Sequence, residues 1–354
     1  MKQVTKKLMI IAGSLVAAGL ILTTFAFAFG GLNITSLNTE LPYEEKNYTY
    51  SSAEVKSLSV KDVDCDVELV GTQENKISVT TLENEKNRYD VKLSPSGELR
   101  IEYHSTQKWY EYIHFGFYIQ FPSRKLTIEV PEKFIGEVKA STVSGNIALS
   151  TLDLQKGLTL STTSGELSLT DTGTADRLTV SSVSGGIELE NCKINNALNL
   201  STTSGDISVD TATTAGDITA STISGVVMIR KTEAQGKTDF SSTSGDISMD
   251  ASTAVSGISV GSGSGSIRLE KSSTKGDVDL HSTSGDINFT QLSGNNLKFK
   301  SISGEVAGTL LGKSEDYSVA VSTTSGAKDV PQSQNGSKRL EASTTSGDIS
   351  IRFE

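Results

Sequence analysis

Apolar and polar residues alternate along most of the chain, and the alternation returns with a period of twenty residues. In one copy, Leu158 and Leu160 precede a Ser-Gly pair, and Leu167 and Leu169 follow it. Alternation of this kind is typical of β-strands, and a fixed period of this length indicates stacked structural repeats. The glycine of the pair recurs at Gly145, Gly165, Gly185, Gly205, Gly225, Gly245, Gly265 and Gly285, and then less regularly at Gly304, Gly326 and Gly347.

Each period is predicted to hold two strands of about five residues, with a third, weaker segment closing the turn. The strands meet at the Ser-Gly pair, where glycine is expected to supply the backbone conformation that a corner demands. One copy has too few apolar side chains to offset its ordering entropy, so the copies must stack. Stacking places equivalent residues in one buried column, formed by Leu158, Leu178, Leu198, Ile218, Ile258 and Val278.

The predicted fold is therefore all-β: a single-stranded β-solenoid, or β-helix, with coils of about twenty residues. A propeller is the alternative, because forty residues would make one four-stranded blade. The solenoid is favoured because identical residues recur at identical positions, as stacked columns require.

A second rhythm covers two periods. The residue after the Ser-Gly pair is acidic in every other coil, as in Glu166, Asp206, Asp246 and Asp286. Two positions before the glycine, Val143, Val183 and Ile223 alternate with Thr163, Thr203 and Thr243. Spacing the carboxylates over alternate coils reduces their repulsion, and turn chemistry is the expected reason for the aspartates. Calcium binding is not favoured, because the glycine-rich nine-residue coil of calcium solenoids is absent from the sequence.

A different segment opens the chain. Lys2, Lys6 and Lys7 precede an uncharged apolar run over residues 8–29, which is long enough to span a bilayer as a helix. Because the basic residues lie at its amino end, we expect a single-pass cell-membrane protein with a cytoplasmic N-terminus and an extracellular C-terminal domain. The small-x-small pattern of Ala26-Phe27-Ala28 leaves a cleaved signal peptide, and so a secreted protein, as the alternative.

Four regions are predicted. Residues 1–30 form the basic tip and transmembrane anchor (or signal peptide), residues 31–54 a tether, residues 55–135 irregular N-terminal coils, and residues 136–354 the regular solenoid. The segment 64–69 stands where a later coil has its Ser-Gly corner, which suggests a degenerate first turn.

An aromatic insertion over residues 104–124 interrupts the irregular coils. It either folds across exposed core of the solenoid or forms a contact surface for a membrane leaflet, a peptide or a glycan. His104 and His114 flank or enter it, but two histidines without a matched pattern are weak evidence for a metal. The possible contact residues are Trp109, Tyr110, Tyr112, Phe115, Phe117, Tyr118 and Phe121.

The inventory of reactive residues is thin, so no enzyme, cofactor or metal is predicted. The two cysteines, Cys65 and Cys192, are interpreted as structural and too far apart for a disulfide. The third histidine, His281, lies beside Ser282 on a strand face that elsewhere carries an outward hydroxyl stripe. A net charge of −10 argues against nucleic acid and against direct attraction to anionic wall polymers. The stripe consists of Ser161, Ser181, Ser201, Ser221 and Ser241.

The recurring Ser-x-x-Ser-Gly-Asp-Ile phrases, and the strand-like segment 126–131 before the first regular coil, carry a resemblance. From about Val55 to the carboxyl end, the chain resembles the bacterial putative-adhesin family of β-strand repeat proteins, whose biochemical function is unknown. With one anchor in front, the layout is similar to the membrane-anchored component of the Lia cell-envelope stress system of Gram-positive bacteria. The resemblance implies no catalytic residues.

The predicted function is that of a non-enzymatic, membrane-anchored extracellular β-solenoid that acts as an adhesin or surface-interaction protein of the bacterial cell envelope. Its partner would be a protein or glycan at the cell surface, with membrane contact through residues 8–29 and no nucleic acid. The alternative is an accessory or regulatory protein of a cell-envelope stress response, which would bind a membrane protein or a lipid-directed antibiotic.

Overall fold

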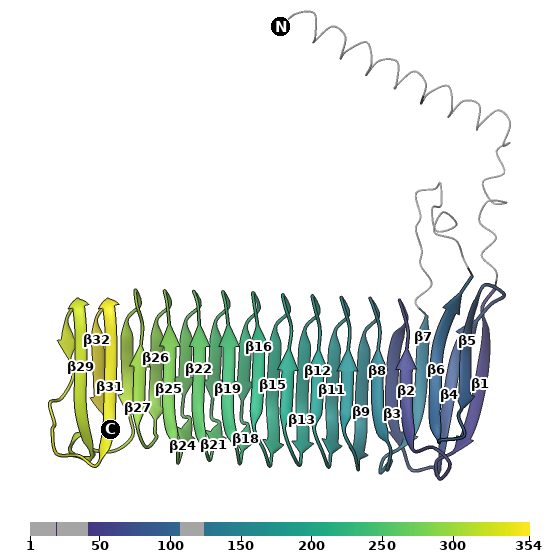
Figure 1. Cartoon of the computed structure of the whole chain (residues 1–354), viewed down its shortest axis with the longest axis horizontal. Helices are drawn as coiled ribbons and strands as arrows, with labels where there is room; N and C mark the ends of the chain where they lie inside the picture. The colour runs from purple at the N-terminus through teal and green to yellow at the C-terminus, as the bar shows by residue number, and fades with distance from the viewer. Residues whose placement is uncertain (1–18, 20–41, 107–123) are drawn as a thin grey trace, which may run out of the picture.

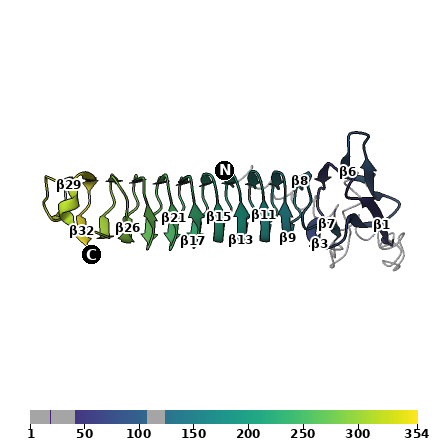
Figure 2. The same ribbon diagram turned by 90° about the horizontal axis from the view of Figure 1, so that it is seen from below.

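The chain folds into a rod of stacked β-coils, seen from the side in Figure 1 and from below in Figure 2. The computed structural model describes residues 19, 42–106 and 124–354. Strands at equivalent positions pair in parallel with a register of twenty residues, as Leu158 does with Leu178 and Leu178 with Leu198. This parallel, coil-to-coil pairing confirms the β-solenoid and excludes the propeller.

Two sheets form the long sides of the rod. In the described part of the chain, sheet 1 has 14 strands and contains the strands that precede the Ser-Gly corner. Its strands are β2 (Ser57–Lys61), β5 (Asn87–Leu93), β6 (Glu98–Ser105), β8 (Glu137–Ser141), β10 (Leu158–Ser161), β12 (Leu178–Ser181), β14 (Leu198–Ser201), β16 (Ile218–Thr222), β19 (Lys237–Ser242), β22 (Gly257–Ser262), β25 (Asp277–Ser282), β27 (Leu297–Lys300), β29 (Tyr317–Ser325) and β31 (Lys338–Ser346).

Sheet 2, over the same described residues, has 18 strands and contains those that follow the corner. They are β1 (Glu44–Ser51), β3 (Asp66–Thr72), β4 (Lys76–Glu83), β7 (Lys125–Pro131), β9 (Ile147–Leu154), β11 (Leu167–Thr174), β13 (Ile187–Ile194), β15 (Ile207–Thr214), β17 (Val227–Arg230), β18 (Glu233–Ala234), β20 (Ile247–Asp250), β21 (Thr253–Ala254), β23 (Ile267–Glu270), β24 (Ser273–Thr274), β26 (Ile287–Leu292), β28 (Val306–Leu310), β30 (Lys328–Asp329) and β32 (Ile349–Phe353).

The weaker third segment of each coil is the far end of a sheet 2 strand. In each regular coil one non-glycine residue has a positive φ, for example Asp171 at 49° and Asn191 at 53°. This left-handed residue bends the chain, so that Leu149 and Leu152, three residues apart in β9, both point into the core. After β17, β20 and β23 the bend interrupts the strand, and the far end becomes a separate two-residue strand, β18, β21 or β24.

The core consists of columns that run along the rod between the sheets. The predicted column from Leu158 to Val278 is confirmed, with one addition: Thr238 occupies the position between Ile218 and Ile258 and is 1% exposed. The neighbouring column joins Leu200 to Ala220 and then to Phe240. A large ring thus follows a small methyl group, which keeps the column filled.

Chain order and coil order differ at both ends of the rod. Strand β2 pairs in parallel with both β6 and β8, so the first coil in sequence lies second in space. At the other end, β31 lies between β27 and β29, so the last coil in sequence is the penultimate one in space. Antiparallel strands β5 and β1 close the N-terminal end, against β6 and β4 respectively.

The structure describes only part of the amino-terminal region to which the predictions apply. Within the described residues 19, 42–106 and 124–354, no helix is long and apolar enough to cross a membrane. The predicted span over residues 8–29 lies outside these residues, apart from Gly19. Part of the stretch predicted as a tether is strand: residues 44–51 form β1, which pairs with β4 in an antiparallel register from Glu44–Glu83 to Ser51–Lys76.

Candidate functional site

A ladder of buried hydroxyl groups runs beneath the Ser-Gly corner. The Gly165 N–H donates to Thr162 Oγ1 at 3.0 Å, and that hydroxyl donates to the carbonyl of Gly145 in the preceding coil at 3.4 Å. Thr202 repeats both bonds with Gly205 and Gly185, at 3.1 and 3.2 Å. Each hydroxyl therefore satisfies two buried backbone groups, which explains why serine or threonine recurs three positions before the glycine.

The glycines at the corner are needed for close packing, and the prediction that they supply a special conformation is wrong. None of them has a positive φ: among the described glycines only Gly97, Gly257 and Gly312 do. A Cβ added at Gly185 would instead lie 2.5 Å from the carbonyl carbon of Gly165 in the preceding coil. Hydrogen-bonded coils leave no room for that atom, so the glycine column follows from the spacing of the stack.

The corner carboxylates and amides bond from one coil to the next. Asp206 Oδ1 accepts the N–H of Val226 at 2.8 Å, and Asp246 Oδ1 accepts the N–H of Ser266 at 2.7 Å. In the same way, Asn146 Oδ1 accepts the N–H of Glu166 at 2.8 Å. The prediction that local turn chemistry explains these residues is thus corrected, since each caps the neighbouring coil. Among the regular coils, Asp206 and Asp246 form this bond on alternate coils, whereas Asp66 and Asn146 form it on consecutive ones. Within the described part of the chain, no group of three or more His, Cys, Asp or Glu residues is placed to hold a metal ion.

A row of exposed branched apolar side chains marks the outer side of the same corner. Val143, Val183 and Ile223 lie on every second coil and are 49%, 47% and 51% exposed. With coils about 4.8 Å apart, the spacing between them is about 10 Å. Val63, on the coil next to Val143, and Ile302, further along, are 48% and 45% exposed. These five residues are called the corner row below.

Exposed threonines fill the coils between the apolar members of the corner row. Thr163, Thr203 and Thr243 occupy the same position of the intervening coils and are exposed. The corner thus presents a straight edge of small, mostly β-branched side chains with a carboxylate beside every threonine. Aligned apolar side chains on a surface indicate an interaction site more strongly than scattered ones do.

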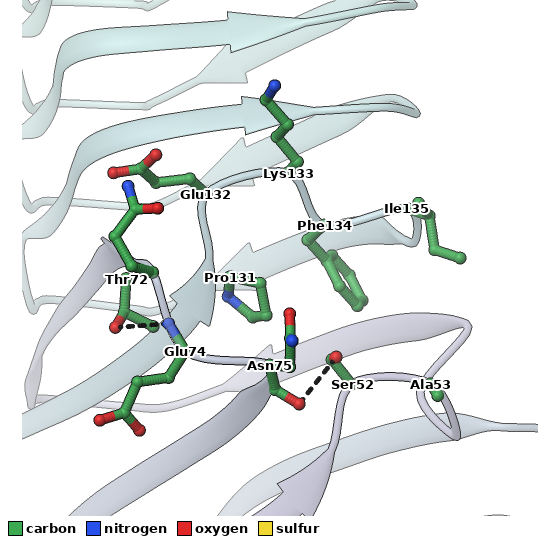
Figure 3. Close-up of a pocket in the computed structure, with 11 residues that line it drawn as sticks. Ser52, Ala53, Thr72, Glu74, Asn75, Pro131, Glu132, Lys133, Phe134 and Ile135 are labelled. Atoms are coloured by element: carbon green, nitrogen blue, oxygen red, sulfur yellow. Dashed lines mark hydrogen bonds between the residues drawn. The ribbon is translucent and has the colours of Figure 1, made fainter.

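A cleft of about 370 Å³ lies near the N-terminal end of the rod, where three loops meet (Figure 3). It is lined by residues 52–53, 72–75 and 131–135. Ser52 Oγ donates to the Asn75 carbonyl at 3.0 Å across it, and Lys133 points away from it. Ile135 is 63% exposed at its rim. Most of the lining residues are polar, and Pro131, Phe134 and Ile135 supply its apolar part.

A buried ionic cluster lies under the β5–β6 hairpin. Asp62 Oδ1 accepts the backbone N–H groups of residues 63–65, and its Oδ2 accepts the hydroxyl of Tyr89 at 2.5 Å. Burial raises the pKa of Asp62, while these hydrogen bonds oppose the rise. Burial also lowers the pKa of Arg124, whose guanidinium lies 4.2 Å from the ring centre of Tyr103 and pairs with Asp64. The cluster fixes the irregular end of the solenoid.

The predicted site residues divide into two groups. The aromatic residues from Trp109 to Phe121, and with them His114, lie outside the described residues, so the predicted contact surface stays a prediction. The described ends of that insertion, β6 and β7, are the strands that flank a corner in every other coil. The described ends of the insertion, Thr106 and Arg124, therefore lie at the edge that carries the corner row.

The remaining predicted residues are described. Cys65 and Cys192 are buried and free, as predicted, and burial raises their pKa values to about 12 and about 11. The outward serines of sheet 1 form the predicted hydroxyl stripe, half-buried to exposed. The corner row itself was missed as a site, although the alternation of Val143 with Thr163 was visible in the sequence.

The chain is similar to a known protein family and to several solved structures. The Toastrack DUF4097 family profile matches residues 55–260 and 251–354. No curated protein matches the chain. Among solved structures, a protein named as a putative adhesin from Parabacteroides distasonis is 11% identical with a TM-score of 0.48, over 71% of this chain and 97% of that one. Another so named, from Parabacteroides merdae, is 13% identical with a TM-score of 0.41, over 71% and 93%.

Proposed function

The chain belongs to the Toastrack DUF4097 family, and we propose that this member is a non-enzymatic surface-interaction protein of the bacterial cell envelope. Residues 8–29 anchor it in the cell membrane, and the solenoid extends outside the cell. The resemblance to β-strand repeat proteins of unknown function, drawn from the sequence, is confirmed by the family match. The binding role, the anchor and the location are proposals.

The observation that carries the proposal is the corner row. Exposure of one β-branched side chain is ordinary, but Val143, Val183 and Ile223 repeat with the register of the stack and are the most exposed large apolar side chains of their coils. A straight row on a stiff rod contacts a partner at several points together, without the entropy cost of ordering a flexible surface. The edge is therefore suited to an extended protein or glycan.

The direction of the rod fits an anchor at the amino end. The described chain enters the solenoid through β1 at the N-terminal end, and β29 and β30 lie at the opposite end (Figure 1). A membrane segment before β1 would leave the corner row accessible along the side of the rod and the β29 end directed away from the membrane. A cleaved signal peptide would give the same rod as a secreted protein.

The alternative function is regulation of a cell-envelope stress response through a membrane protein or a lipid-directed antibiotic. The observation that favours it is the cleft lined by Pro131 and Phe134, because it lies at the end of the rod that the tether would hold near the membrane. The two functions therefore use different parts of the molecule. Substitutions in the corner row and at the cleft separate them.

The proposal is tested with the full-length protein in detergent, measured for binding to isolated envelopes of a Gram-positive bacterium. The triple variant Val143→Ser, Val183→Ser and Ile223→Ser removes apolar surface from the corner row. We expect at least about tenfold weaker binding with unchanged thermal stability. The matched control changes Thr163, Thr203 and Thr243 to serine at the same positions of the intervening coils. Equal binding by both triple variants would contradict the proposal.

A second variant addresses the alternative. Ile135→Asp places a charge at the rim of the cleft, where the side chain is already exposed and its loss costs little stability. If envelope binding depends on Ile135 and not on the corner row, the result supports the regulatory function and contradicts the adhesive one. Protease digestion of intact cells that express the full chain tests its location, because an extracellular solenoid is cleaved and a cytoplasmic one is protected.

A further inference from the structure

The terminal strand at the distal end of the rod has an open edge. Strand β29 is the last strand of sheet 1 and, in the described part of the chain, pairs with β31 alone. Its nine residues, from Tyr317 to Ser325, include no charged residue, no proline and no glycine. Such a strand presents unpaired backbone groups that are ready to pair with another strand.

A loop of the same chain covers only the first part of this edge. The N–H of Val319 donates to the carbonyl of Ser333 at 2.9 Å, which shows that Val319 directs its backbone groups away from β31. Because backbone groups alternate in direction along a strand, Val321 and Thr323 direct theirs to the same open side. The stretch from Ala320 to Ser325 is thus available for pairing.

The opposite end of the rod is protected in a way that β29 is not. Strand β1, at the edge of sheet 2, begins with Glu44, Glu45 and Lys46. Strand β5, at the edge of sheet 1, carries Arg88, Asp90 and Lys92. Charged side chains on edge strands prevent unintended pairing. Because β1 and β5 carry such charges and β29 carries none, the distal end is the one suited to pairing with another strand.

We propose that β29 pairs antiparallel with β29 of a second copy, joining two rods tail to tail. The flanks of the strand favour this partner, since exposed Asp316 precedes β29 and exposed Lys328 follows it. Antiparallel pairing brings the acidic flank of one copy toward the basic flank of the other, whereas parallel pairing would oppose like charges. Asp329 is already engaged by Arg352 at 3.8 Å. A two-fold contact of this kind closes on itself and yields a dimer.

The register follows from the open side of the strand. With Thr323 opposite Thr323 of the second copy, Ser322 lies opposite Thr324 in each direction. The pairing itself stands on the structure alone. Its meaning rests on the proposed function, because with an anchor at the N-terminal end a tail-to-tail dimer would join rods from two facing membranes.

The test is the self-association of the full-length protein in detergent, measured by sedimentation equilibrium. In the variant Ser322→Lys with Thr324→Lys, two pairs of like charges face each other across the two-fold, and we expect at least about tenfold weaker association. In the variant Ser322→Lys with Thr324→Glu, opposite charges face each other, and association should return to within about threefold of the wild type. The control Ser201→Lys with Ser241→Lys adds the same charge to exposed positions of sheet 1 in the middle of the rod and should leave association unchanged.

Two results would overturn the pairing. A wild-type chain that stays monomeric at about 100 μM excludes a useful dimer, and a Lys-Lys variant that associates like the wild type excludes this edge. Aggregation of cells that express the full chain tests the biological role separately. If the Lys-Lys variant loses self-association while cells still adhere through the corner row, the proposed function stands and the bridging role fails. If the wild type dimerises in solution but its cells neither aggregate nor bind envelopes, the pairing stands and the proposed function fails.

Discussion

Replacing Gly185 with alanine should strongly destabilise the solenoid, whereas the same change at its neighbour Gly186 should not. A Cβ at residue 185 would lie 2.5 Å from the Gly165 carbonyl carbon and closer still to its oxygen. A Cβ at residue 186 would meet nothing nearer than the Asp206 carbonyl oxygen at 3.7 Å, an ordinary contact. The two substitutions are adjacent and chemically identical, so they isolate the effect of coil spacing.

The expected loss of stability depends on which atoms must move to make room for the added Cβ. Overpacking in a core costs about 1–3 kcal/mol when side chains can adjust. At residue 185 the obstacle is the backbone carbonyl of Gly165, and Gly185 cannot move away from it easily, because its N–H donates to Ser182 Oγ at 2.8 Å and ladders hold both sides. We therefore expect a loss of at least about 3 kcal/mol. At residue 186, alanine should leave stability unchanged or raise it by about 0.5 kcal/mol, because it restricts the unfolded chain.

Urea denaturation of the full-length protein, followed by far-ultraviolet circular dichroism, measures both effects. The expected result is a lower transition midpoint for Gly185→Ala and a wild-type midpoint for Gly186→Ala. Equal midpoints for the two variants would refute the argument from coil spacing. Backbone conformation would then be the better explanation for glycine at the corner.

Three further predictions concern other parts of the molecule. Leu200→Asp places a charge in the column between Val180 and Ala220 and should cost about 4 kcal/mol or more; an unchanged melting temperature would contradict the stacked core. Burial alone would raise the pKa of Glu83, but hydrogen bonds from Lys46 and two hydroxyls lower it, so its contribution to stability is present above the ordinary pKa of about 4.5 and lost as the pH falls. Glu83→Gln should flatten that acid dependence in thermal melts, and an unchanged dependence would exclude this carboxylate as its source. Deleting residues 108–121 and closing the gap with a Gly-Ser turn should lower stability if the insertion covers core, or abolish envelope binding at unchanged stability if it is a contact site; loss of neither would reject both interpretations.

The regular coils were predictable because one period contains all the information that sets their register. Leu158, Leu178 and Leu198 pair residue for residue as the twenty-residue spacing requires. A slip by one residue would turn these side chains outward. The degenerate first corner was also visible, since Cys65 precedes the strand Asp66–Thr72 as a corner glycine precedes later ones.

The ends were not predictable from the same pattern. The strands β2 and β6 both offer alternating apolar residues to β8, so the period does not decide which of them lies next to it. The choice depends on the β5–β6 hairpin and on the antiparallel pairing of β4 with β7, and the second of these joins strands that are distant in sequence. At the C-terminal end the same ambiguity applies, because the period does not predict that β31 lies between β27 and β29.

The corner chemistry was only half visible in the sequence. Alternation of acidic and other residues after the Ser-Gly pair was plain, but its reason depends on which atom lies within reach of Asp206 in the next coil, and that is a property of the stack. Likewise, the sequence showed that Val143 alternates with Thr163 but not that the valine points to solvent. Exposure depends on the path of the corner, which a pattern of residue types does not specify.

The central claim is that the corner row contacts the cell envelope, and site-specific photocrosslinking tests it most directly. A photoreactive amino acid is placed in the full-length protein at Thr203 on the corner, and in a second sample at Ser201 on the flat face of sheet 1; both side chains are exposed. After illumination with isolated Gram-positive envelopes, the account predicts crosslinks from position 203 that disappear in the Val143, Val183 and Ile223 to serine background, and few from position 201. Equal crosslinking from both positions, or crosslinking from the flat face alone, would contradict it.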